Sequence, residues 1–128
     1  MIFRNPETVH NPLASYSHQV EIAGNTRWLV MSAQIGMNKH GEVPEDIFSQ
    51  IEFALDNIIL NLEAAGMQKE DLIKLTFYFV GSHNIEKRRN LINEKLGKHQ
   101  PCMTVLYVAS LATASLKVEI EAWACREK

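Results

Sequence analysis

Two glutamates near the end of the chain have the spacing most suited to chemistry. Glu119 and Glu121 stand two positions apart where polar and apolar residues alternate, so a β-strand would project both carboxylates from one face. A carboxylate held among apolar neighbours has a raised proton affinity and can orient or deprotonate a water molecule. The same pattern fits two solvated carboxylates, or one paired with Lys117. Both interpretations stay open from the pattern alone.

The other reactive residue types lack a spacing typical of catalysis or metal binding. No two of the five histidines stand three or four residues apart, and no serine occupies a G-x-S-x-G turn. The glycines form neither a dinucleotide fingerprint nor a phosphate loop. We therefore expect no metal, no cofactor and no serine nucleophile. Cys102 is interpreted as a packed thiol, and the run Lys87-Arg88-Arg89 as a solvated helix surface.

Apolar periodicity predicts the elements that must position these residues. Period-two segments indicate strands over residues 16–22, 28–32, 72–80, 104–109 and 116–125, and period-3.6 stripes indicate helices over residues 45–65 and 84–96. Residues 1–15 are expected to form an extended arm. The first two strands are predicted to form a hairpin across the Gly24-Asn25 turn. The order predicts a single α+β domain over residues 1–128, with two helices on one face of a mixed sheet.

The second face of this sheet has no helix to cover it. Alternation places Phe77 or Tyr78, together with Tyr107 and Trp123, on the uncovered face. Such a face is too apolar for open solvent, so we expect it to contact other subunits. A partly wet face with scattered aromatic residues is the alternative.

Composition excludes several classes of protein. The 128 residues carry thirteen basic and fifteen acidic side chains, a net charge of −2, which argues against a nucleic-acid surface. The longest nearly continuous apolar stretch, residues 58–62, is far shorter than the ~20 residues of a membrane span. The first residues do not resemble a secretory signal, and the two cysteines have no ligand spacing. We expect a cytoplasmic protein that contacts neither membrane nor nucleic acid.

Six segments, in register from residue 14 to residue 122, together resemble the RidA/YjgF family of reactive-intermediate deaminases, also called the liver perchloric-acid-soluble protein family. The segments are Ala14-Ser15-Tyr16-Ser17, Ser32-Ala33-Gln34-Ile35-Gly36, residues 57–66, Asp71-Leu72-Ile73-Lys74-Leu75-Thr76, Gly97-Lys98-His99-Gln100-Pro101 and Val118-Glu119-Ile120-Glu121-Ala122. The resemblance implies a chorismate-mutase-like fold assembled as a homotrimeric barrel, with small-molecule pockets between subunits.

The resemblance also implies a reaction and site residues. Family enzymes hydrolyse enamines and imines, such as 2-aminoacrylate and 2-iminobutanoate, to 2-keto acids and ammonia without a cofactor. The glutamate that positions the attacking water falls on Glu119, and the pocket tyrosine falls on Tyr16. The strand end that shapes the pocket falls on Ser32 and Ala33, where alanine replaces the usual glycine.

The arginine that pairs with the substrate carboxylate in the family does not carry over. The family pattern proline-x-arginine reads Pro101-Cys102-Met103 here, followed by Thr104, and both Met103 and Thr104 are expected to contact substrate. The resemblance thus indicates a subgroup lacking the catalytic arginine, with weak activity on ordinary 2-iminobutanoate and 2-iminopropanoate. Arg89 falls near the position of the family's pocket asparagine. It either supplies a replacement charge in the site or is a solvated arginine on the helix surface.

Three functions are compatible with these observations. We expect first a hydrolytic deaminase of an imine or enamine metabolite in a pocket between subunits. The alternative is a non-catalytic protein that binds a small metabolite in the same trimer pocket, which suits the adaptable apolar contacts of Met103. A remote alternative, an endoribonuclease that inhibits translation, is disfavoured by the acidic charge balance.

Overall fold

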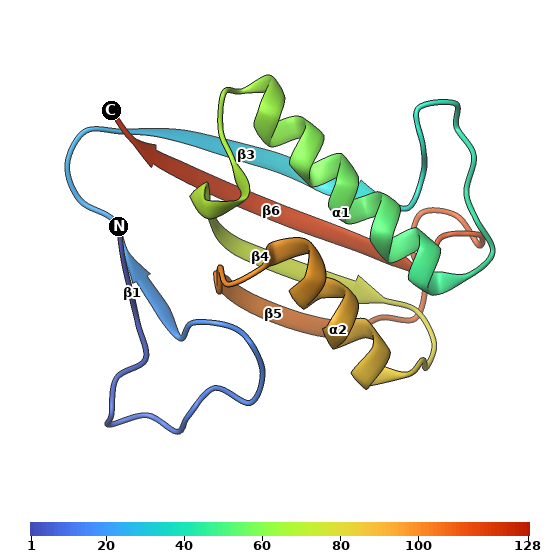
Figure 1. Cartoon of the computed structure of the whole chain (residues 1–128). Coiled ribbons are helices and arrows are strands. Elements are labelled where there is room, and N and C mark those ends of the chain that lie inside the picture. Colours follow the sequence, from blue (N-terminus) through green and yellow to red (C-terminus); the bar gives the residue numbers. More distant parts are fainter.

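A four-stranded mixed sheet forms the centre of the computed structural model, which describes residues 1–128. Its strands lie in the order β3 (Thr26–Ile35), β6 (Val118–Glu127), β4 (Leu72–Phe79) and β5 (Cys102–Tyr107). Strand β6 is antiparallel to both of its neighbours, whereas β4 and β5 are parallel (Figure 1). The predicted mixed sheet of an α+β domain is therefore confirmed.

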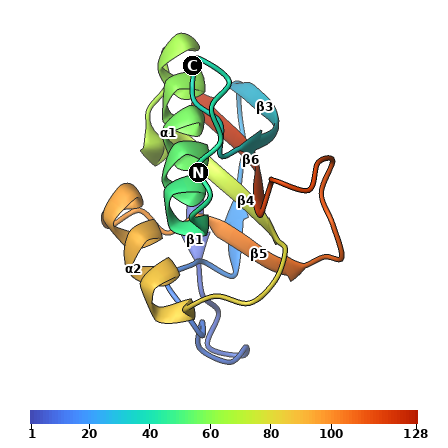
Figure 2. The same cartoon turned by 90° about the vertical axis from the view of Figure 1, so that its right-hand side faces the viewer.

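Two helices, α1 (Ile47–Ala64) and α2 (Ile85–Leu96), cover one face of this sheet (Figure 2). Each begins at a residue that caps it: Asp46 accepts the N–H of Ser49 at 3.1 Å, and Asn84 accepts the N–H of Lys87 at 3.0 Å. Both helices match their predicted bounds to within two residues. No helix combines the length and apolar character that a bilayer span needs.

The core lies between the helices and the sheet. It contains buried side chains from both layers: Ile51, Leu55, Ile58, Leu62, Leu72, Leu75, Phe77, Phe79, Ile92, Leu96, Val118, Ile120, Ala122 and Ala124. Alternation along β6 from Val118 to Ala124 buries the even-numbered residues there and turns Glu119, Glu121 and Trp123 to the opposite face, which no helix covers.

The aromatic residues predicted for the open face are confirmed except for Tyr107. Phe77 is fully buried under the helices, so Tyr78 is the β4 aromatic residue on the open face. Tyr107 pairs with Phe79 across the parallel β4–β5 ladder, and this register places it on the helix side, where its hydroxyl accepts a hydrogen bond from Arg88. The prediction that Tyr107 lies on the uncovered face was therefore wrong.

The N-terminal segment forms a small sheet of its own rather than the predicted hairpin. Strand β1 (Ile2–Arg4) pairs antiparallel with β2 (Gln19–Glu21), and β2 makes no ladder with β3. Three-residue strands are too short to show a period, which is why the sequence pattern missed β1. Ser17 fixes this segment beside β5, since its hydroxyl donates to the Gln100 carbonyl at 2.5 Å and its N–H to the Pro101 carbonyl at 3.2 Å.

A buried glutamine attaches α1 to the start of β6. The Gln50 amide donates to the carbonyls of Pro44 and Ser115 at 2.8 and 2.9 Å, and its oxygen accepts the N–H of Lys117 at 2.8 Å. Gly36 leaves the room this needs, because a Cβ there would lie 2.5 Å from the Gln50 Cα. These contacts set the position of Glu119 relative to α1.

Candidate active site

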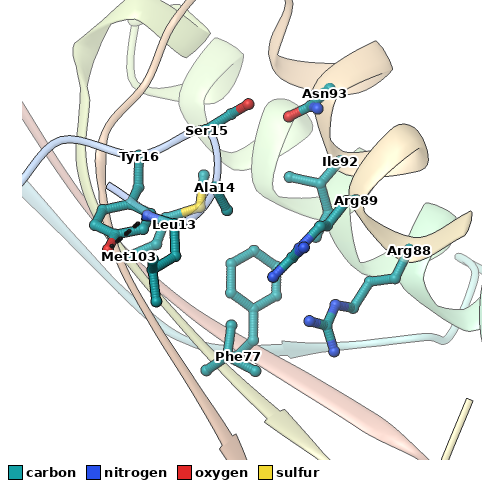
Figure 3. A pocket seen from close by; sticks show the side chains of 11 residues that line it. Leu13, Ala14, Ser15, Tyr16, Phe77, Arg88, Arg89, Ile92, Asn93 and Met103 are labelled. Carbon is teal, nitrogen blue, oxygen red and sulfur yellow. Dashed lines mark hydrogen bonds between the residues drawn. The ribbon is translucent and has the colours of Figure 1, made fainter. Parts of the chain in front are cut away.

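An open cavity of about 440 Å³ lies between the N-terminal segment, α2 and β5 (Figure 3). Its walls come from four parts of the chain and are mostly apolar: Leu13, Ala14, Ser15, Tyr16, Phe77, Arg88, Arg89, Ile92, Asn93, Met103 and Val105. The volume falls in the range of about 300–1,000 Å³ typical of small-molecule sites.

Three of the predicted site residues meet in this cavity. Tyr16 is half-buried, and its hydroxyl accepts the N–H of Leu13 at 3.3 Å. Met103 packs its thioether against the core from β5, so this wall of the cavity carries no charge. Arg89 is exposed and makes no ion pair or side-chain hydrogen bond within the chain, and Figure 3 shows it extending from α2 toward the cavity.

A fourth cavity residue, Arg88, was missed by sequence reasoning. Its side chain is only 6% exposed, whereas the run of three basic residues was expected to be solvated throughout. The missed signal is helical spacing: Arg88 stands four residues before Ile92 and eight before Leu96, on the stripe of α2 that faces the core. Ile85, the first residue of α2, is by contrast 45% exposed.

Glu119 lies on the open face of β6, outside this cavity. Its neighbours across the ladders are Ile35 on β3 and Tyr78 on β4. Its carboxylate makes no hydrogen bond or ion pair within the chain. Lys117, a possible partner by sequence, donates instead to the Ala114 carbonyl at 3.0 Å. The half-buried Glu119 carboxylate is therefore free to bind water.

Glu121, the second glutamate of the pair, is occupied. Its carboxylate accepts a hydrogen bond from the Tyr78 hydroxyl, and this bond is the main reason why the pKa of Tyr78 is raised above its usual value. Ionising Tyr78 would put two negative charges in contact. The structure thus separates two glutamates that the sequence pattern treats alike.

Ser32 and Ala33 lie at a bulge in β3. The β3–β6 register runs from Met31 opposite Ala122 to Gln34 opposite Ile120, so two residues of β3 stand against Glu121 alone. A bulge of this kind redirects side chains and interrupts the ladder, and bulges are frequent beside active sites. Ser32 is exposed and Ala33 half-buried.

Thr104 follows Met103 on β5 and therefore points to the opposite face. Its hydroxyl accepts a hydrogen bond from the Lys74 ammonium at 2.6 Å on the open side of the sheet. It does not line the cavity.

The predicted site residues therefore fall into two groups. Tyr16, Arg89 and Met103 line the cavity, whereas Ser32, Ala33, Glu119 and Thr104 lie outside it. Strands β3 and β5 form opposite edges of the sheet, three strand spacings or about 14 Å apart. Thr104 is next to Met103 on β5 but points to the other face of the sheet. A molecule the size of a four-carbon imino acid in the cavity therefore cannot touch Ser32, Ala33 or Glu119 of the same chain.

Next to Arg88, His83 provides a pH-dependent contribution to stability. Burial, and then the Arg88 charge, lower the pKa of His83. The unfolded chain thus takes up a proton before the folded one, so we expect the free energy of unfolding to fall as the pH drops below about 6.5. The contribution of neutral His83 to stability is complete above that pH. It is lost progressively as the pH falls toward the lower pKa that His83 has in the folded chain.

Urea unfolding of the wild type and of His83→Gln, at about pH 7.5 and about pH 5.5, measures this contribution. Glutamine can still accept the Arg88 hydrogen bond but does not titrate, and the other four histidines are common to both proteins. The wild type should lose more stability than the variant on acidification. Equal losses would rule out His83 as the cause.

Comparison with known proteins places these features in a family context. The sequence matches the family described as Endoribonuclease L-PSP over residues 7–126. It is 34% identical to a RutC family protein of Pyrococcus horikoshii, with 94% of both chains covered. It is 32% identical to the 2-iminobutanoate/2-iminopropanoate deaminase of Escherichia coli, with 77% of this chain and 79% of that one covered. A crystal structure of a Rid-family protein of unknown function from Yersinia pestis superposes with a TM-score of 0.84 at 28% identity, over 98% of both chains.

Proposed function

This chain belongs to the endoribonuclease L-PSP family, which includes imine deaminases of the RidA/YjgF group, and from that membership we propose that it is a cofactor-free deaminase. Its substrate is a small imine or enamine, hydrolysed in a pocket between subunits of a homotrimer. The proposed compartment is the cytoplasm, because both cysteines are free thiols.

The observation that carries the proposal is the separation of the predicted site residues into two groups. The cavity group has polar and apolar walls but no carboxylate, and the sheet-face group has a free carboxylate, Glu119, but no cavity. A neighbouring subunit that sets its open sheet face against the cavity supplies what each group lacks. The site then consists of Tyr16, Arg89 and Met103 from one subunit and Ser32, Ala33 and Glu119 from the next, with Thr104 at their boundary.

The open sheet face has the composition that such contacts require. Four large apolar side chains are exposed there: Trp28 by 52%, Val30 by 57%, Leu106 by 44% and Trp123 by 40%. The rings of Trp28 and Trp123 pack edge to face with their centroids 6.5 Å apart. Trp28, Val30 and Trp123 lie together on the adjacent strands β3 and β6. Exposed apolar side chains grouped in this way are unfavourable in water and favour burial against a second copy of the chain.

The reaction needs only water and a base. Water adds through its oxygen to the carbon of the C=N bond while the Glu119 carboxylate takes a proton from it. That proton passes to nitrogen and gives a carbinolamine. Glu119 then takes the proton of the new hydroxyl and passes it to the amino group, the C–N bond breaks, and ammonia leaves a 2-keto acid. Met103 supplies no cation for the substrate carboxylate, so we propose that Arg89 contributes to holding it.

One observation supports a second candidate, a metabolite-binding protein without catalysis. Met103 closes one wall of the cavity with an uncharged side chain packed on the core. Such a wall holds an apolar ligand without orienting it for attack. RNA cleavage is not proposed, because the chain carries a net charge of −2.

The direct test is hydrolysis of 2-aminoacrylate and 2-iminobutanoate generated in the assay, with release of ammonia and keto acid followed against buffer. We expect acceleration by the wild-type protein. A rate equal to buffer, together with saturable binding of a small carboxylate, would instead support the binding role.

Assembly is tested separately by light scattering at micromolar concentration. The homotrimer is expected at about 44 kDa, three times the 14.6 kDa of the chain. A monomer would leave Glu119 and the cavity unconnected and would contradict the shared site.

A further inference from the structure

Arg88 is a buried cation without a buried anion. Its Nη1 donates to the Tyr107 hydroxyl at 2.7 Å and to His83 Nε2 at 3.1 Å, and its guanidinium lies 5.0 Å from the centroid of the Phe79 ring. All three partners are neutral groups, and Arg88 takes part in no ion pair. Removing a charge from water without a counter-charge is costly, so such a residue is a candidate for binding an anion.

A second donor without a partner lies in the same cluster. Because His83 Nε2 accepts the Arg88 N–H, the ring of the neutral imidazole carries its proton on Nδ1. Nδ1 is buried and has no hydrogen-bond partner, the only such side-chain atom in the chain. The buried Arg88 guanidinium thus lacks a counter-charge, and the buried imidazole N–H beside it lacks an acceptor.

The cavity beside Arg88 is positively charged and otherwise mainly apolar. Arg88 and Arg89 both line it, and no aspartate or glutamate does (Figure 3). The rest of the lining includes the apolar side chains of Phe77, Ile92 and Met103. A hollow of about 440 Å³ also exceeds what a four-carbon acid would fill.

We propose that Arg88 binds the carboxylate of an anionic ligand whose apolar body lies against Phe77, Ile92 and Met103. The inference rests on the proposed function and specifies its substrate: a 2-imino acid with a bulky branched or aromatic side chain. The cation that holds the carboxylate, Arg88, thus lies on α2, on the side of the cavity across from Met103 at the start of β5. The two free nitrogens of the guanidinium, Nε and Nη2, are the donors that remain for the carboxylate.

Binding without turnover provides the test. Calorimetry would compare 3-phenylpropanoate with the neutral 3-phenylpropanamide on the wild-type protein. We expect the carboxylate to bind about ten- to a hundredfold more tightly, as for a charge-assisted hydrogen bond. Arg88→Met should remove most of this preference and leave only the contribution of Arg89, and Arg88→Lys should retain a larger part of it.

Lys87→Met is the matched control. Lys87 precedes Arg88 on the same helix and has the same charge, but its ammonium lies 4.4 Å from the centroid of the Phe48 ring, outside the cavity. This variant should keep the wild-type preference for the carboxylate.

Equal affinity of the wild type for the acid and the amide would overturn the inference, and so would a folded Arg88→Met protein that prefers the acid as strongly as the wild type does. If Arg88→Met does not fold, a preference in Arg88→Lys equal to that of the wild type would overturn it instead. Carboxylate-selective binding by a protein with no deaminase activity would support the inference while the proposed function fails. Deaminase activity without carboxylate-selective binding would support the proposed function and overturn the inference about Arg88.

Discussion

Replacing Glu119 by glutamine is expected to lower kcat for imine hydrolysis about 10²- to 10⁴-fold, the contribution of a well-placed general base. Glutamine preserves the size of the side chain and can still contact water, but it cannot accept a proton. Because the Glu119 carboxylate makes no ion pair or hydrogen bond in the chain, removing its charge leaves no buried partner unsatisfied. Stability should therefore stay within about 0.5 kcal/mol of the wild type. Initial rates of ammonia release and thermal melts measure the two effects.

Glu121→Gln is the control on the same strand and face. Its oxygen can still accept the Tyr78 hydrogen bond, and it is proposed to play no part in the reaction. A rate close to that of the wild type is expected. Equal losses in the two variants would mean that the charge of the open face, rather than a base at position 119, governs the reaction.

Introducing arginine at position 103 should increase kcat/KM for 2-iminobutanoate by about 10²-fold. Met103 lines the cavity on the side across from α2, where a new guanidinium can pair bidentately with a short substrate that does not reach Arg88. Repulsion from Arg88 and Arg89 works against this gain, but the negative charge of a bound carboxylate offsets that repulsion. Progress curves at several substrate concentrations give kcat/KM.

Met103→Leu separates charge from shape. Leucine retains the apolar volume without a charge, so short imino acids should be turned over at the wild-type rate. If Met103→Arg shows no gain while its oligomeric state and melting temperature are unchanged, then the lack of a positive charge at position 103 is not what limits turnover of short substrates. The bulge that carries Ser32 and Ala33 would then be the next position to examine.

Longer elements were predictable from the sequence because their periods repeat several times. The apolar stripe of α1 and the alternation along β6 each extend over many residues, and both elements lie within two residues of the predicted bounds. Strand β1 has three residues, and its pairing with β2 depends on a contact across the fourteen residues between Arg4 and Gln19. No local pattern encodes that pairing.

The site was only partly predictable, for a related reason. Its position on β6 places Glu119 on the open face. Its carboxylate has no hydrogen-bond partner because the Tyr78 hydroxyl donates to Glu121 instead, and the sequence does not show which of the two glutamates Tyr78 contacts. In the same way, the burial of Arg88 depends on Tyr107 and His83, which come from other parts of the chain. Helical spacing alone favours its burial, yet charge argues for exposure, and only the tertiary neighbours decide.

The shared site is the central claim of this account, and subunit complementation tests it most directly. One partner is Glu119→Gln, which lacks the base. The other is Ala14→Trp, which fills the cavity from an exposed position. Each variant alone should be nearly inactive.

Unfolding and refolding the two variants together at equal concentration produces mixed trimers. In random mixtures about one interface in four combines an open cavity from one subunit with Glu119 from its neighbour, so we predict about a quarter of the wild-type activity. Activity that stays at the level of the separate variants, in mixtures shown to contain mixed trimers, would contradict a site built from two subunits.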